Sequence, residues 1–195
     1  MYKASLNDND SDIVGHCGED IKNEALVQLI ADILADTGLG DFALVTTGGV
    51  AENGSANRRG VCGVLYEGPV NETDLMVLQS DSRNIQVIEL TGEQVLALLN
   101  NGKTTADNNY QEGLEATWTY TWSGIDVSGN LGSVSASFNG QEISPEKTYR
   151  VVFLYGDYPV EWKDTETIED TGLTESEAIR QYVAVHNPLM APEVK

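Results

Sequence analysis

Residues 84–99 read NIQVIELTGEQVLALL, a strand pattern that runs directly into a helix pattern. The first part carries the apolar residues Ile85, Val87 and Ile88 between polar ones, which is typical of a β-strand. Thr91-Gly92-Glu93-Gln94 then fits a capping box, because the Thr hydroxyl and the Gln amide can satisfy free backbone donors of a helix. The helix that follows is predicted from Val95, Leu96, Leu98 and Leu99.

A helix and a strand are also predicted upstream of this stretch. Gly38 is expected to end the helix as a C-cap. The short apolar run Phe42–Val45 comes next, between glycine-containing segments, which suits a buried strand. The helix itself is predicted from one apolar stripe at helical spacing, formed by Ile21, Ala25, Leu26, Leu29, Ile30, Ile33 and Leu34.

The second half of the chain is rich in predicted strands. Asn139-Gly140 is the dipeptide most typical of a type I′ hairpin turn, so the residues on either side are expected to pair. Thr174–Glu177 is a second capping box and opens a last helix. Helices and strands mix without a strict β-α-β repeat, which favours the α+β class, with mixed β-sheets and flanking helices. The strands predicted here are Leu114–Trp122, Ser133–Phe138, Gln141–Ile143 and Thr148–Tyr155.

The length of 195 residues suits one large domain. Residues 1–18 are polar and acidic and are interpreted as an N-terminal arm, and residues 19–195 as the folded domain. The chain has no apolar run of about 18 residues, so no membrane insertion is expected. Its first residues do not follow the signal-peptide pattern, so any export signal is expected upstream, on a longer parent chain.

The charge balance is strongly acidic. The chain has 31 Asp and Glu against 11 Lys and Arg, which gives a net charge of −20. Such a surface repels phosphate backbones and anionic lipid headgroups, so no nucleic-acid partner is expected. A small phosphorylated ligand remains compatible, because Arg58-Arg59 or the surroundings of Arg83 can reverse the field over a short distance.

Cysteine and histidine are too few for a zinc site. Cys17 and Cys62 lack the Cys-x-x-Cys spacing, and the chain has two histidines, His16 and His186. The two cysteines form either one disulfide, if the parent protein is exported, or two buried thiols.

A calcium-loop spacing occurs near the N-terminus. Ile13 stands at the sixth position of this pattern, where an EF-hand loop needs glycine, and no helix is predicted before it. A disordered acidic arm is the alternative interpretation. The pattern consists of Asp8, Asp10, Asp12 and Glu19.

Several motifs are similar to those of a known family. Ala25–Asp32 is similar to a segment usually written N-x-G-N-L-I-A-D. Gly40–Val50 is similar to a strand and loop written A-D-x-A-L-x-N-x-G-G-I-R, and Val87–Val95 to a strand and helix written L-T-G-x-x-L.

Further motifs follow in the same order. The strand after Gly113-Leu114, the Asn139-Gly140 turn and Lys147–Val151 are similar to stretches written G-x-x-x-x-Y and G-x-x-I-x-x-x-x-x-Y-x-V. Gly156–Tyr158 resembles a shortened G-G-D-G-Y/F loop. In this order, over about Asn23 to Lys195, the motifs resemble the C-terminal domain of the 5′-nucleotidase family.

This resemblance implies a division of labour between two domains. In the family the C-terminal domain holds the nucleoside, while a separate N-terminal metallophosphoesterase domain holds two metal ions. The resemblance therefore implies a non-catalytic, nucleotide-binding domain that needs a metallophosphoesterase domain in cis. No cofactor is expected in this chain, and divalent metal is expected only in the other domain. The family also implies an extracytoplasmic location: periplasm, cell surface or secretion.

The resemblance carries ligand-binding roles onto specific positions. Asp157 matches the acid that hydrogen-bonds the ribose, and Tyr155 or Tyr158 supplies a ring for the base; packing of Tyr158 on Trp162 is the alternative. A glycine pair matches the loop where the backbone approaches the ligand, although a plain structural turn explains it equally well. The predicted ligand-binding residues are Gly48, Gly49, Tyr155, Asp157 and Tyr158.

Three positions depart from the family pattern. The family's asparagine and arginine around the glycine pair fall on Thr46 and Ala51, and its first stacking aromatic falls near Asp81. A carboxylate cannot stack on a purine and repels a phosphate. Arg58-Arg59 either replaces the lost arginine or is a solvated surface pair. The sequence thus supports a second hypothesis, a degenerate, ligand-free interaction module of the same fold.

The purified 195-residue chain is expected to release no phosphate from AMP when manganese is added. A two-metal site needs several clustered His, Asp and Asn ligands, which this sequence lacks. A phosphate-release assay on preparations free of contaminating phosphatase checks this. Sustained release by the chain itself would contradict it.

Overall fold

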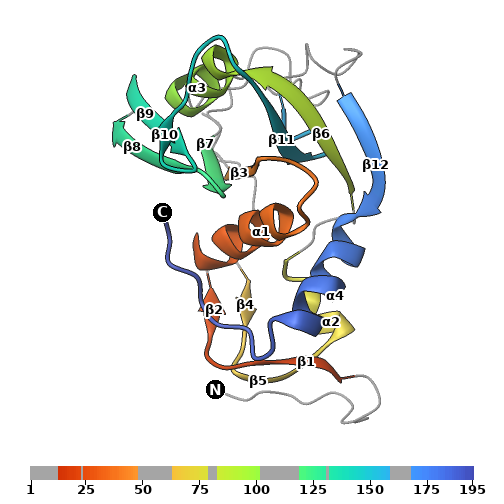
Figure 1. Cartoon of the computed structure of the whole chain (residues 1–195). Helices are drawn as coiled ribbons and strands as arrows, with labels where there is room; N and C mark the ends of the chain where they lie inside the picture. The colour runs from red at the N-terminus through yellow and green to blue at the C-terminus, as the bar shows by residue number, and fades with distance from the viewer. Residues whose placement is uncertain are drawn as a thin grey trace, which may run out of the picture.

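The centre of the protein is a five-stranded mixed β-sheet. The computed structural model describes residues 13–22, 24–47, 63–78, 83–101, 119–130, 132–158 and 168–195. The parallel neighbours in the sheet are β3 and β11, and the other neighbouring pairs are antiparallel. The strand order is β12 (Ile168–Thr174), β6 (Asn84–Thr91), β11 (Thr148–Leu154), β3 (Phe42–Thr47) and β7 (Thr119–Ser123), as Figure 1 shows.

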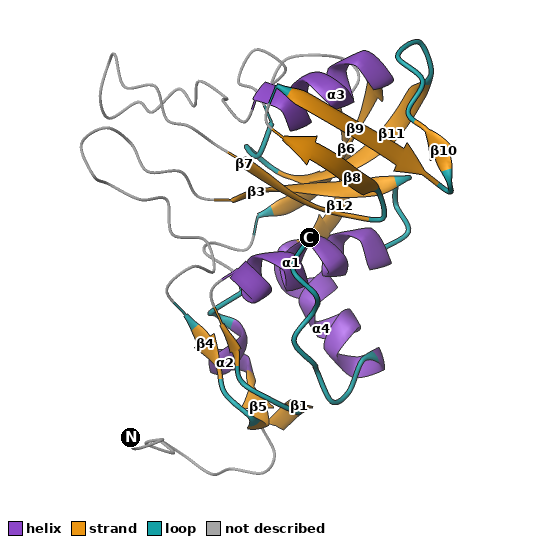
Figure 2. Cartoon of the chain, turned by 90° about the vertical axis from the view of Figure 1, so that its left-hand side faces the viewer, coloured by secondary structure: helices purple, strands orange, loops and turns teal. Residues whose placement is uncertain are grey.

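Both faces of this sheet are covered. In β3, Ala43 and Val45 face one hydrophobic cluster, and Phe42 and Leu44 face the other. The first cluster lies against α1 (Glu24–Asp36) and α4 (Glu175–Val185). The second lies against α3 (Gly92–Asn101) and a three-stranded sheet of β10 (Gln141–Glu142), β9 (Ser133–Phe138) and β8 (Asp126–Asn130), on the opposite side of the central sheet in Figure 2. This layered arrangement confirms the α+β class with mixed sheets and flanking helices.

Two small sheets complete the half of the molecule that contains α1. They pair β1 (Ile13–Cys17) with β5 (Gly68–Asn71), and β2 (Ile21–Lys22) with β4 (Val64–Leu65). The short helix α2 (Glu72–Leu75) follows β5 directly.

The predicted arm, residues 1–18, contains part of the fold. Cys17 is 3% exposed, its thiol donates to the carbonyl of Glu19 at 3.0 Å, and Leu189 of the C-terminal segment pairs with it. The described fold therefore begins at Ile13 rather than at residue 19. Residues 1–12 and Cys62 lie outside the described residues, so the choice between a disulfide and two thiols stays open.

The local patterns of the sequence are mostly confirmed. Asn139 and Gly140 have φ values of 52° and 73°, as a type I′ turn requires, and Gly38 ends α1 with φ of 66°. Ile21 differs from the prediction, because it lies in β2 and α1 begins only at Glu24. Its apolar side chain fits the helical stripe by spacing, but it reaches the same core from a strand. Of the strand predicted at 114–122, the part before Thr119 lies outside the described residues.

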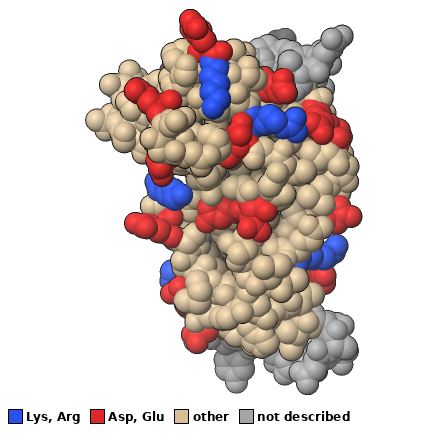
Figure 3. Space-filling model, viewed as in Figure 1, with Lys and Arg blue, Asp and Glu red and all other residues tan. Residues whose placement is uncertain are grey.

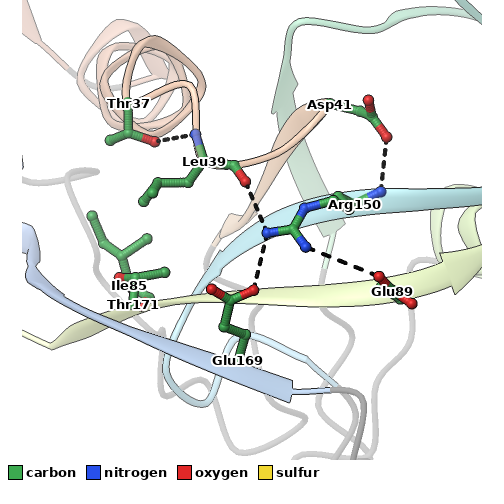
Figure 4. A network of polar contacts seen from close by, with 8 residues as sticks. All are labelled: Thr37, Leu39, Asp41, Ile85, Glu89, Arg150, Glu169 and Thr171. Carbon is green, nitrogen blue, oxygen red and sulfur yellow. Dashed lines mark hydrogen bonds and ion pairs between the residues drawn. The ribbon is translucent and has the colours of Figure 1, made fainter.

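Charged side chains join the amino-terminal ends of β3 and β11. Arg150 donates from its main chain to Asp41 at 2.8 Å, and from Nη2 to Glu169 at 3.0 Å and to the Leu39 carbonyl at 3.4 Å (Figure 4). Glu89 lies 3.9 Å from the same guanidinium. The charged groups are about half exposed, so this network contributes little to stability, about 0–1 kcal/mol per pair.

Acidic side chains gather in one part of the visible surface (Figure 3), most of which carries neither acidic nor basic groups. Figure 3 shows a band of acidic side chains across the middle of one face, over α1, with few basic groups beside it. Within the described ranges, no helix is long and apolar enough to cross a membrane.

The substitution Glu177→Gln should destabilise the protein more at pH 7 than at about pH 3. The main-chain amide of Thr174 donates to the Glu177 carboxylate at 2.9 Å and the Thr174 hydroxyl at 2.8 Å, which lowers the pKa of Glu177 below its ordinary 4.5. A lowered pKa in the folded state means that this stabilisation is present above pH 4.5 and is lost as the pH falls through the folded pKa. The measurement is the urea midpoint of both proteins at the two pH values.

The chain supplies a matched control for this measurement. The other capping box predicted from the sequence uses the uncharged Gln94, whose Oε1 accepts from the amide of Thr91 at 2.8 Å. The effect of Gln94→Ala should therefore be equal at the two pH values. A Glu177→Gln effect that persists unchanged at low pH would show that ionisation is irrelevant to the cap.

Candidate functional site

Three chain segments meet at one edge of the central sheet. Because β3 and β11 are parallel, their carboxyl-terminal ends lie at the same edge, and β6, antiparallel to β11, begins there. The amide of Tyr155 donates to the carbonyl of Asn84 at 2.9 Å and fastens two of the segments together. We call this region the carboxyl edge and define it by Thr46–Thr47, Arg83–Asn84 and Tyr155–Tyr158.

Asp157 lies at the centre of the carboxyl edge. It is 3% exposed. Its Oδ1 accepts from Nη1 of Arg83 at 2.8 Å, and its Oδ2 accepts from the main-chain amide of Thr46 at 3.1 Å. Its own amide donates to the carbonyl of Leu154 at 2.9 Å, which closes the turn after β11. One carboxylate therefore contacts the end of β3 and the residue that precedes β6.

The protonation of Asp157 reflects two opposing influences. Burial raises the pKa of its carboxyl above the ordinary 3.8, while the Arg83 guanidinium and the hydrogen bonds from Thr46 lower it. A carboxylate without these partners would be strongly disfavoured in this interior, because an uncompensated buried charge is costly. The carboxylate of Asp157 can therefore stay buried and charged only while it is paired with Arg83.

Arg83 is fixed by several groups. Its Nη1 also donates to the carbonyl of Tyr155 at 2.8 Å, and its own carbonyl accepts from the amide of Glu175, the first residue of α4, at 2.8 Å. The side chain is 15% exposed. The sequence indicated only a positive charge near this position, because the Asp157 partner is 74 residues away and no local pattern joins the two.

The two tyrosines of the carboxyl edge have different surroundings. Tyr158 is 7% exposed, its hydroxyl donates to Oε1 of Gln86 at 2.8 Å, and its ring meets Phe153 edge-on at 6.1 Å. Burial raises the pKa of Tyr158. Tyr155 is 45% exposed. Tyr155 is thus the predicted aromatic residue whose ring is accessible, while Tyr158 belongs to the core.

Several predicted positions lie outside the described residues. Among them are Gly48 and Gly49, which follow Thr47, the last residue of β3, in the sequence. Trp162, the alternative packing partner of Tyr158, also lies outside, as do the positions that depart from the family pattern or were weighed as replacements: Ala51, Arg58, Arg59 and Asp81.

No metal site is found in the part of the chain that the structure describes. There, no group of three or more His, Cys, Asp or Glu could hold a metal ion. Of the calcium-loop pattern, Asp8, Asp10 and Asp12 lie outside this part. Glu19 is described, and its Oε1 accepts from the amide of Ala191 at 3.1 Å.

A sequence model of a known family matches most of the chain. The match covers residues 10–158, and the model is that of the 5′-nucleotidase C-terminal domain. The chain belongs to this family. A comparison with curated protein sequences gives no match. The family match includes all three segments of the carboxyl edge and ends at Tyr158.

Solved structures share the fold at low sequence identity. A 5′-nucleotidase precursor from Thermus thermophilus is 20% identical, with a TM-score of 0.62 over 95% of this chain. The NAD nucleotidase of Haemophilus influenzae is 17% identical, with a TM-score of 0.66 over 94%. A putative 5′-nucleotidase from Staphylococcus aureus, solved with alpha-ketoglutarate, is 11% identical, with a TM-score of 0.63 over 100%.

These matches concern one part of each larger protein. The chain spans 38%, 37% and 44% of the three solved chains. Because the matches cover 94% or more of this chain, the shared fold extends beyond Tyr158, where the family match ends, into β12 and α4.

The substitution Tyr158→Phe should lower the free energy of unfolding by about 1–3 kcal/mol. It removes the hydroxyl and leaves the buried Gln86 carbonyl without this donor. The matched control is Tyr155→Phe on the exposed ring, with an expected change within about 0.5 kcal/mol. Urea unfolding measures both. Equal effects would show that the Tyr158 hydroxyl is not held in the interior.

Proposed function

We propose that this protein is the non-catalytic, nucleotide-binding domain of a 5′-nucleotidase-type phosphoesterase. The observation that supports this is the meeting of three separate segments at the carboxyl edge. The family resemblance assigns ligand contacts to two of them, the Gly48-Gly49 loop after β3 and the turn Tyr155–Tyr158. The third, the start of β6, follows Asp81, where the family's first stacking aromatic falls.

The ligand-facing groups of the proposed site are those that the interior does not use. The ring of Tyr155 is 45% exposed and offers a face on which a base can stack. Gly48 and Gly49 would bring main-chain amides close to the ligand, because a glycine has no Cβ to hold it away. Asp157 and Tyr158, the other predicted ligand residues, are buried and would hold the turn that carries Tyr155 in place.

Hydrolysis in this proposal belongs to a second domain. The three solved structures with this fold are longer proteins, all named as nucleotidases, one as a precursor and one as putative, and the chain spans less than half of each. We place a two-metal metallophosphoesterase domain in cis, where the metals would activate the attacking water and this domain would orient the phosphate. The proposed location is extracytoplasmic.

A ligand-free interaction module of the same fold is the second candidate. The burial of Asp157 and Tyr158 favours it, because neither side chain presents an accessible surface of any size to a ligand. The replacements at Ala51 and Asp81 favour it as well, since they remove a cation and a stacking ring.

Isothermal titration calorimetry decides between the two candidates. AMP, adenosine and UDP-glucose are titrated into the whole chain. Nucleotide binding by the domain predicts measurable affinity for at least one of them, and Tyr155→Ala should weaken it about tenfold, because base stacking contributes roughly 1–3 kcal/mol. The control is Tyr66→Ala, at an exposed tyrosine of another loop. Absence of binding by all three ligands would refute the proposal in favour of the interaction module.

A further inference from the structure

The Asp157 carboxylate already has internal partners for both of its oxygens. Arg83 donates to Oδ1, and Thr46 donates to Oδ2 from its main chain and adds a side-chain hydrogen bond. An ionised carboxylate offers about four acceptor positions. With 3% of the residue exposed, a ribose hydroxyl has little surface through which to reach those that remain.

These contacts connect segments that are far apart in the sequence. Through Asp157 and Arg83, the end of β3, the start of β6 and the turn after β11 are joined at one point. The carbonyl of Arg83 adds the first turn of α4, through the amide of Glu175. In addition to the β3–β11 pairing, this ion pair therefore links the segment that leads into Gly48-Gly49 with the segment that carries Tyr155.

We propose that Asp157 is a positioning residue, which acts through Arg83 and Thr46 to fix the carboxyl edge and does not itself contact the ribose. This inference deepens the proposed function and rests on it for its effect on ligand binding. The motif assigns ribose recognition to the turn that contains Asp157. In the structure, the Asp157 carboxylate instead contacts Arg83 and Thr46.

The energetics of buried ion pairs give the proposal a specific signature. Removal of one partner leaves an uncompensated charge in the interior, whereas removal of both does not. The loss of stability in the double variant is therefore expected to be smaller than the sum of the losses in the Arg83 and Asp157 single variants. Two groups that act separately, one on the ligand and one on the fold, would instead give independent effects.

The first experiment separates a ribose contact from a positioning role. Wild type, Asp157→Asn and Arg83→Met are titrated with AMP and with 2′,3′-dideoxy-AMP, which lacks both ribose hydroxyls. A positioning role predicts that each substitution weakens both ligands by the same factor, within about twofold, so the ratio of the two affinities is that of the wild type. A tenfold weaker affinity for AMP in Asp157→Asn, with the affinity for the dideoxy analogue unchanged, would overturn the proposal.

The second experiment needs no ligand. The urea midpoints of Asp157→Asn, Arg83→Met and the double variant are compared, and the amide chemical shift of Thr46 is followed by NMR. The double variant should unfold at a higher urea concentration than Arg83→Met alone, and the Thr46 amide should move in each variant. Additive losses together with an unmoved Thr46 amide would contradict the proposal.

A milder variant keeps the test decisive where a substitution prevents folding. Arg83→Lys retains the charge but replaces the planar guanidinium by a compact ammonium, so it should recover part of the loss seen in Arg83→Met, both in the urea midpoint and in the Thr46 shift. No recovery in either measurement would contradict the proposal that the ion pair fixes the carboxyl edge. If wild type binds no nucleotide, the proposed function fails, while the ligand-free measurements still decide whether Asp157 positions the edge.

Discussion

The parallel pairing of β3 with β11 determines the rest of this structure. Two strands that run in the same direction at the centre of a sheet bring their carboxyl-terminal ends to one edge. The antiparallel strands β6 and β7 then have to begin at that edge, and β12 has to end there. As both faces of the central strands are buried, every one of these connections is forced to the ends of the sheet, where the side chains of the candidate site gather.

Ion pairs have different roles at the two ends of the sheet. Around Arg150 the charged groups are about half exposed and solvent screens them. The network therefore adds little stability at the amino-terminal ends of the strands. At the carboxyl edge the Asp157 carboxylate is 3% exposed, and its link to Arg83 is surrounded by protein. A buried pair adds little net stability over an apolar substitute, but it tolerates only one arrangement of its partners. If the carboxyl edge binds a nucleotide as proposed, this is where a fixed arrangement of side chains has functional value.

The fold and the family define what kind of contribution this domain makes. The family match and the solved structures assign the chain to the 5′-nucleotidase C-terminal domain, and they do so over less than half the length of the larger proteins. A domain of this type would supply binding energy from parts of a substrate that do not react, and such energy can orient a reacting group elsewhere. In the proposed function, the accessible Tyr155 would do so by direct contact and the buried Asp157 by support.

The sequence by itself determined the elements and their caps. Both capping boxes, the Asn139-Gly140 turn and the strands around Val87 and Leu44 follow from interactions within a few residues, which local patterns record. It also identified the segments of the candidate site through family motifs. The tertiary structure alone decided that Asp157 pairs with Arg83, that Tyr158 turns inward while Tyr155 remains accessible, and that Ile13–Cys17 joins the fold. These outcomes depend on which strands become neighbours, and that is set by burial over long sequence separations, for which no local pattern of residues exists.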